Sequence, residues 1–160
     1  MSMVQASAVN ESEIRQWLEE VPDPEIPVVS LVDLGVIREI KRDGDTWLVN
    51  VAPTYSGCPA TRIIHDDVRA KLYEKGLRPS DFQVVSVLSP PWSTDWISKS
   101  GRQKLADYGI APPQPSGKPK ACPQCGSSDL ELVSQFGSTP CKASWRCRSC
   151  LEPFDYFKCI

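Results

Sequence analysis

Long apolar runs, a strong excess of one charge and a secretion signal are all missing from this chain. No apolar stretch approaches the roughly 20 residues needed to cross a bilayer. Residues 1–10 lack the basic start and apolar core of a signal peptide. A formal net charge of -2 argues against a general nucleic-acid-binding protein. We therefore expect a cytoplasmic protein that binds neither membranes nor nucleic acid.

The residue sets of common enzymes are scarce as well. The chain has a single histidine, His65, and no glycine-rich phosphate loop or Ser-His-Asp set. His65 follows Cys58 by two helical turns, so it should lie about 10 Å further along the helix axis, which disfavours a Cys–His catalytic dyad. We expect no catalytic activity of the chain's own.

What the chain does have is cysteine, with seven among 160 residues. Four of them form two Cys-x-x-Cys pairs, Cys122 with Cys125 and Cys147 with Cys150, and this spacing lets one tight turn direct two sulfurs to one metal. Four thiolates in a tetrahedron are typical of structural zinc, with an iron–sulfur cluster as the alternative. Paired metal-ligand spacings and an odd cysteine count favour a reducing compartment over a disulfide-built domain.

Two further cysteines, Cys141 and Cys159, flank the second pair. Each is open to two interpretations, a buried small hydrophobe or an alternative ligand in an iron-loaded form. For Cys141 we favour the buried interpretation. The aromatic run at 154–157 predicts the last strand of the ribbon and a packing face, and an exposed aromatic face would serve as a docking surface.

The remaining chain predicts a small α/β sandwich with a three-stranded sheet and flanking helices, followed by a C-terminal zinc-ribbon β module. The predicted elements are a helix from 11 to 21, strands at 36–41 and 46–52, a helix from 59 to 75, a strand at 82–88 and a helix after Asp95. Asp43-Gly44 joins the first two strands as a hairpin. The buried side of the last helix is expected to comprise Trp96, Ile97, Leu105 and Tyr108.

A segment rich in proline, serine, glycine and lysine at 111–120 has the composition of a linker. The domain boundary should fall near Gln114. We therefore predict a first domain at 1–112, a linker at 113–120 and a zinc ribbon at 121–160.

The loop before the second predicted helix presents a single thiol. Pro59 suits the first helical position, which makes Cys58 the N-cap, where unpaired backbone N–H groups and the helix dipole favour the thiolate. Cys58 would then bind a soft metal, or it packs inward and has no role. Asp23 and Glu25, on a proline-rich turn, either join a site with Cys58 or satisfy the backbone of their own turn.

Three segments of the first predicted domain resemble a known family. The turn at 23–27, the segment at 31–35 and the loop at 54–59 are similar to the small metal–sulfur cluster assembly family, which includes SufT-like proteins and eukaryotic cytosolic iron–sulfur targeting factors. The C-terminal module, closing with residues 152–159, resembles more narrowly the PaaD (PaaJ) family of bacterial phenylacetate degradation. The similarity runs from about Ile14 to Ile160.

This resemblance implies an assembly factor for the multicomponent phenylacetyl-CoA epoxidase, whose reductase carries an iron–sulfur cluster. It maps the family's reactive cysteine onto Cys58 and its acidic turn onto Asp23 and Glu25. The expected cofactor is structural zinc, with iron or a cluster carried transiently. The expected partners are the epoxidase components, above all the reductase, iron–sulfur carrier proteins and a second copy of the chain. A structural accessory subunit is the alternative, and a nucleic-acid-binding ribbon is the weakest one.

Overall fold

The computed structural model describes residues 8–54, 60–137, 139 and 141–158. It divides into two compact units, Met1–Trp92 and Ser93–Ile160, each with a sheet of its own. The division after Trp92 lies earlier in the chain than the predicted boundary near Gln114, because the segment after Trp92 packs with the C-terminal strands. The boundary near Gln114 stays a prediction. Across the described residues, none of the helices combines the length and hydropathy that crossing a bilayer requires.

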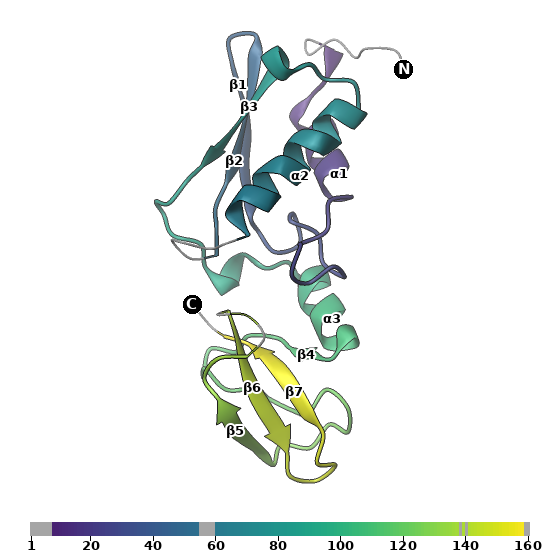
Figure 1. Ribbon diagram of the computed structural model, residues 1–160, viewed down its shortest axis with the longest axis vertical. Coiled ribbons are helices and arrows are strands. Elements are labelled where there is room, and N and C mark those ends of the chain that lie inside the picture. Colours follow the sequence, from purple (N-terminus) through teal and green to yellow (C-terminus); the bar gives the residue numbers. More distant parts are fainter. Residues whose placement is uncertain (1–7, 55–59, 138, 140, 159–160) are drawn as a thin grey trace. The chain divides into compact units, whose positions relative to one another are not determined.

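The first unit is a three-stranded sheet with two helices (Figure 1). Its elements are α1 (Glu11–Leu18), β1 (Ile37–Asp43), β2 (Thr46–Val51), α2 (Thr61–Glu74), η2 (Pro79–Asp81) and β3 (Phe82–Ser86), where η denotes a short 3-10 helix. The strand order is β1-β2-β3, with β1 antiparallel and β3 parallel to β2. The predicted three-stranded α/β fold, built from one hairpin and one helical crossover, is confirmed.

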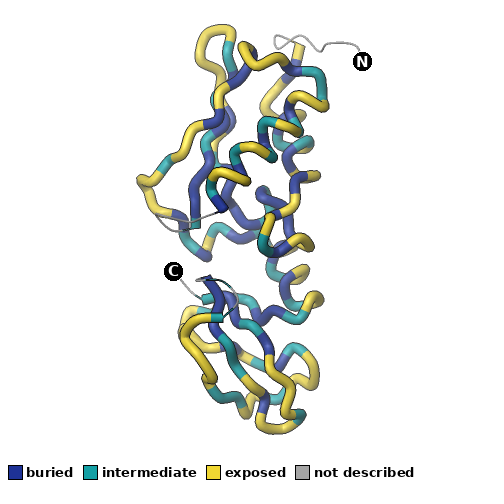
Figure 2. Tube along the Cα trace, in the orientation of Figure 1, coloured by how far each residue is buried: buried dark blue, intermediate teal, exposed yellow. Residues whose placement is uncertain are grey.

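Alternating burial along the chain explains this arrangement. In β2 the side chains of Trp47, Val49 and Val51 are buried, whereas those between them are only partly covered (Figure 2). Because side chains alternate along a strand, the buried ones all lie on one face of the sheet, and this face packs against the helices. From α2 the matching residues are Val68 and Leu72, which are both fully buried one helical turn apart.

Two helix boundaries differ from the prediction. The helix α1 ends at Leu18 and does not reach the residue before Pro22. The helix α2 begins at Thr61 with Ala60 in the N-cap position, so the prediction that Cys58 is the N-cap was wrong. Pro59 correctly predicted that a helix begins in this region, but the helix begins two residues later than expected. Cys58 itself lies outside the described residues.

The second unit contains the predicted ribbon and adds a strand to it. Its elements are η3 (Thr94–Trp96), α3 (Lys99–Tyr108), β4 (Ile110–Ala111), β5 (Leu130–Ser134), β6 (Lys142–Cys147) and β7 (Pro153–Phe157). The strand order is β4-β7-β6-β5. The strand β7 confirms the predicted last strand of the ribbon, and the antiparallel hairpin β5–β6 pairs with it. The strand β4, which runs parallel to β7, was not predicted.

Of the two roles given to the aromatic run at 154–157, a strand with a packing face is confirmed, and an exposed docking face is excluded. Phe154, Tyr156 and Phe157 are 7%, 1% and 1% exposed. The strand β7 is paired on both sides, by β6 and β4, and the Tyr156 hydroxyl accepts a hydrogen bond from the Gln114 N–H at 3.1 Å. The aromatic run therefore forms the core of the ribbon.

The buried side of the last helix was also predicted only in part. Ile97 and Leu105 are buried as expected, and Trp96 is partly buried, but Tyr108 is 55% exposed. The helix α3 begins only at Lys99, after the N-cap Ser98, and Gly109 ends it in the left-handed conformation with φ 96°. Tyr108 is thus the last helical residue, where the chain turns into β4.

We predict that Leu72→Ala lowers the free energy of unfolding by roughly 2–5 kcal/mol, because Leu72 is fully buried and its truncation leaves a cavity. Ile63→Ala, on the same helix but with 50% of the side chain exposed, should change it by about 0.5 kcal/mol or less. Denaturant unfolding followed by circular dichroism measures both. Equal losses in the two variants would contradict the packing described.

Candidate metal centre and acidic turn

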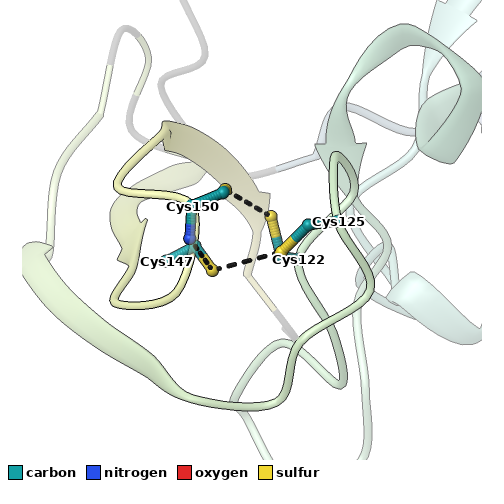
Figure 3. A group of neighbouring side chains, drawn as sticks. All are labelled: Cys122, Cys125, Cys147 and Cys150. Atoms are coloured by element: carbon teal, nitrogen blue, oxygen red, sulfur yellow. Dashed lines mark hydrogen bonds between the residues drawn. The ribbon is translucent and has the colours of Figure 1, made fainter.

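The two Cys-x-x-Cys segments bring four sulfurs together at one end of the ribbon. Cys122 and Cys125 lie on the turn before β5. Cys147 is the last residue of β6, and Cys150 lies on the turn that follows it. The four Sγ atoms all lie within 4.8 Å of one another, with the two pairs facing each other (Figure 3). These four cysteines are referred to below as the sulfur tetrad.

The sulfur tetrad has the dimensions of a zinc site. The Sγ atoms of Cys122 and Cys150 are 3.7 Å apart, and those of Cys125 and Cys147 are 3.5 Å apart. A tetrahedron with zinc–sulfur bonds of about 2.3 Å has edges of about 3.8 Å. The two measured edges therefore match a zinc tetrahedron, and all four sulfurs are close enough to share one ion.

Backbone N–H groups stabilise negative charge on the tetrad. The Cys150 N–H donates to Cys147 Sγ at 3.5 Å, and this bond lowers the pKa of Cys147 to about 6. The Glu152 N–H lowers the pKa of Cys150, but burial and the hydrogen bonds with the other three sulfurs outweigh it and raise that pKa to about 12. One thiol thus ionises readily before a cation draws off the remaining protons.

The tetrad is also part of the ribbon's core. Cys122 and Cys147 are 3% and 0% exposed, and they belong to a cluster of buried residues. Its other members are Ala111, Ala143, Phe154 and Tyr156. Because no position of a four-sulfur tetrahedron is open to a substrate, the chemistry available here is structural.

Neither of the other two C-terminal cysteines is a described member of this site. Cys141 precedes β6, at the end opposite Cys147, and its thiol lies 3.0 Å from the Thr139 hydroxyl. At 4% exposure Cys141 matches the interpretation of a buried small side chain. Its role as an alternative ligand stays a prediction. Cys159 lies outside the described residues.

The acidic turn in the first unit is held by its own carboxylate. Asp23 Oδ1 accepts hydrogen bonds from the Glu25 N–H at 2.9 Å and the Ile26 N–H at 2.8 Å, and Asp23 is 7% exposed. The Asp23 N–H donates to the Val29 carbonyl at 2.8 Å. The structure thus confirms the interpretation in which Asp23 accepts hydrogen bonds from the backbone of its own turn. A role for Asp23 or Glu25 together with Cys58 stays a proposal.

His65 contacts a serine of the sheet. Its Nε2 lies 2.8 Å from Ser86 Oγ at the end of β3. Burial lowers the pKa of His65 below its usual range, and the Arg69 guanidinium lowers it further. The imidazole is therefore neutral at pH 7 and ties α2 to the carboxyl end of β3.

Two contacts beside the acidic turn were missed by the sequence analysis. Ser30 and Asp33 bond reciprocally, the Asp33 N–H to Ser30 Oγ at 2.9 Å and the Ser30 N–H to Asp33 Oδ2 at 3.2 Å. The Ser-x-x-Asp spacing could have indicated this pair. The indole Nε1 of Trp92 donates to the Leu34 carbonyl at 2.8 Å, a contact across 58 residues without a local sequence signal.

Comparison with known proteins places these two sites in context. Residues 11–77 match the iron–sulfur cluster assembly protein family, and residues 113–158 match the PaaD zinc β-ribbon domain. A protein of Escherichia coli, named as a putative subunit of 1,2-phenylacetyl-CoA epoxidase, is 46% identical over 154 residues, which is 92% of each chain. The chain belongs to the PaaD family. Zinc is accordingly the structural metal of its ribbon, and the sulfur tetrad is positioned to hold it.

Other relatives match a smaller part of this chain. The Fe-S protein maturation auxiliary factor YitW of Bacillus subtilis is 34% identical over 55% of this chain and 85% of its own. A solved domain of unknown function, DUF59, from Bacillus anthracis superposes with a TM-score of 0.53 at 28% identity, over 59% of this chain and 90% of that one. These two matches cover little more than half of this chain, and the family match at residues 11–77 assigns the iron–sulfur assembly domain to the first unit.

We predict that Cys147→Ser lowers the zinc content from about one ion per chain to nearly none and unfolds the ribbon, because metal binding is coupled to folding in such modules. Elemental analysis and the dispersion of amide signals in an NMR spectrum measure the two effects. The matched control, Cys141→Ser, replaces a buried thiol outside the tetrad and should keep the zinc. Loss of zinc from the control alone would assign the ligands differently.

We also predict that Asp23→Ala lowers the free energy of unfolding by roughly 1–3 kcal/mol, because two backbone N–H groups lose their acceptor. Asp23→Asn keeps a side-chain oxygen and should cost less. Asp45→Ala, at an exposed position of the β1–β2 turn, serves as the control and should change stability by about 0.5 kcal/mol or less. If Asp23→Ala were as stable as the control, the turn would not depend on this carboxylate.

Proposed function

We propose that this chain is an accessory factor that matures the iron–sulfur-dependent phenylacetyl-CoA epoxidase system, by assisting insertion of iron or a cluster into its reductase or oxygenase component. The observation that carries the proposal is the union of an iron–sulfur assembly domain and a PaaD zinc ribbon in one chain. A relative named as an epoxidase subunit matches both halves, and a relative named as a maturation factor matches the first.

In this proposal Cys58 receives the iron or cluster, which is cargo and not a resident cofactor. The described residues on either side support the assignment, because β2 ends at Val51 and α2 begins at Thr61. Ligands in open α/β sheets bind outside the carboxyl ends of parallel strands, and β2 and β3 are parallel. The positive end of the α2 dipole would favour a thiolate and an anionic cluster there.

Asp23 and Glu25 are proposed to act on the same cargo as a rigid acidic turn. Asp23 Oδ1 is committed to two backbone N–H groups, so its position is fixed. Glu25, which is partly buried, follows Asp23 by two residues on that turn. A carboxylate held in this way can ligate iron without the entropy loss of ordering a free side chain.

The ribbon is proposed to dock the client protein. Its aromatic strand is buried and cannot be the contact surface, but β5 and the residues after it carry exposed apolar side chains. Leu132, Val133 and Phe136 are 45%, 62% and 69% exposed. Zinc would keep this edge of the sheet in one shape, and an iron–sulfur carrier protein would supply the cargo to the first unit.

A structural accessory subunit of the epoxidase is the second candidate, favoured by the word subunit in the name of the relative that covers 92% of this chain. The two candidates differ in what the client lacks when this chain is defective. A maturation factor leaves the client without its metal, whereas an accessory subunit leaves a metal-loaded client that fails to assemble.

We predict that Cys58→Ala yields reductase without its cluster, at the level of a strain that lacks this chain, while zinc content and thermal stability of the variant stay unchanged. Visible absorption and iron content of the purified reductase measure the effect. Ser80→Ala, an exposed residue of η2 next to the amino end of β3, is the control and should support normal loading. Fully loaded reductase with Cys58→Ala would refute the delivery role, and loaded but unassembled components would favour the accessory subunit.

A further inference from the structure

Three large apolar side chains are exposed along the edge strand of the ribbon. Leu132 and Val133 of β5, and Phe136 just beyond it, are 45%, 62% and 69% exposed. In the order β4-β7-β6-β5 the strand β5 is the last, so no other described strand covers its outer side (Figure 1). Single exposed apolar residues are ordinary, whereas several of them close together are typical of an interaction site. These three residues are referred to below as the β5 patch.

A lysine is held in place beside the β5 patch. Lys158 Nζ lies 4.5 Å from the centre of the Phe136 ring and donates to the Gln135 carbonyl at 2.9 Å. The Lys158 backbone N–H donates to the Cys141 carbonyl at 2.9 Å. An ammonium group has three donors, so two of them remain for another acceptor. In the described part of the chain no carboxylate lies within ion-pair distance of Lys158.

The other charges along β5 are compensated within the ribbon. Glu131 accepts hydrogen bonds from Arg146 and, at 3.3 Å, from Arg148. Arg148 also pairs with Asp129 at 3.6 Å. Two cations and two carboxylates thus balance at the start of the strand, whereas the charge of Lys158 stands alone beside Phe136. A partner of complementary charge would therefore place an acidic group at the Phe136 end of the β5 patch.

Two features argue against a second copy of this chain as the occupant. In a two-fold symmetric contact a patch meets itself, so Lys158 of one copy would approach Lys158 of the other with like charge. A β-bulge between Leu132 and Ser134 interrupts the regular pairing of β5, which disfavours continuous edge-to-edge pairing of two such strands. The β5 patch therefore suits a different polypeptide, which contacts it through side chains.

We propose that the β5 patch binds a segment of the client polypeptide in which apolar residues adjoin an aspartate or a glutamate. The acidic side chain pairs with the Lys158 ammonium, and the apolar side chains cover the β5 patch. Because Lys158 is already ordered by Gln135 and Phe136, this pair forms with a smaller loss of side-chain entropy. The client is the one named under the proposed function, on which this proposal rests.

The test is binding of the purified epoxidase reductase, and separately of the oxygenase, to the zinc-loaded full chain at low and at high sodium chloride, measured by isothermal titration calorimetry. One of the two components should bind the wild type, with an affinity that falls as salt rises. Phe136→Ala should weaken binding about 30-fold, as the loss of a central aromatic contact does. Lys158→Gln should weaken it about 5-fold and remove most of the salt dependence, which a merely structural role of the lysine would not do.

Two exposed residues of the same unit provide matched controls. Tyr108→Ala removes an aromatic ring that is 55% exposed at the end of α3, and Lys118→Gln removes an exposed ammonium outside the strands of the ribbon. Both variants should bind the client as the wild type does. The zinc content and Tm of all four variants should stay close to those of the wild type, because none of these side chains belongs to the buried core.

A wild type that binds neither component would overturn the proposal. Unchanged affinity in Phe136→Ala and Lys158→Gln, or a salt dependence that survives Lys158→Gln, would overturn it as well. The iron content of reductase from cells that produce each variant separates this result from the fate of the maturation role. Reductase that carries its cluster without this chain would end the maturation role but leave binding through the β5 patch intact. Normal binding and loading with both patch variants would exclude the β5 patch and leave the maturation role intact.

Discussion

The convergence of four sulfur atoms on one point determines how the second unit is built. The buried cluster of the ribbon has six members, and two of them, Cys122 and Cys147, are sulfurs of the tetrad. An apolar core of this size cannot stabilise a module of about forty residues by burial alone. Zinc therefore replaces much of the missing core. Its ligands lie on the turn before β5, at the end of β6 and on the turn that follows, so zinc also fixes the register of the β5–β6 hairpin and the start of β7.

What the sequence could predict is what depends on neighbouring residues. The Cys-x-x-Cys spacing, the Asp43-Gly44 turn and the apolar period of α2 each express local geometry, and the structure contains all three. The strand β4 could not be found in this way, since it has two residues and pairs with Asp155 and Tyr156, more than forty positions later. That same long-range pairing covers the aromatic strand, which is why the sequence alone left both a packing face and an exposed docking face open for it.

The acidic turn shows a different limit of sequence reasoning. An aspartate in a turn can accept hydrogen bonds from the backbone N–H groups two and three residues later, or it can bind a ligand. The sequence does not distinguish between these two roles. The distances of 2.9 and 2.8 Å to the Glu25 and Ile26 N–H groups show that Asp23 fulfils the first. A carboxylate that accepts two N–H groups can still accept further bonds, so the second role stays a proposal.

Structural zinc and transferable iron require opposite properties of a thiol, and this separates the cysteines into groups. A tetrad that fills all four coordination positions, with Cys147 fully buried, exchanges its ion slowly and offers a cargo no vacant position. Cys141 is buried as well, next to the Thr139 hydroxyl. Of the seven cysteines, Cys58 and Cys159 remain as candidates for transfer chemistry, and both lie outside the described residues. The iron–sulfur assembly match at 11–77 contains Cys58, whereas the ribbon match ends at Lys158, before Cys159. Within the proposed function, transfer is therefore better assigned to the first unit, and the role proposed for the ribbon is recognition of the client.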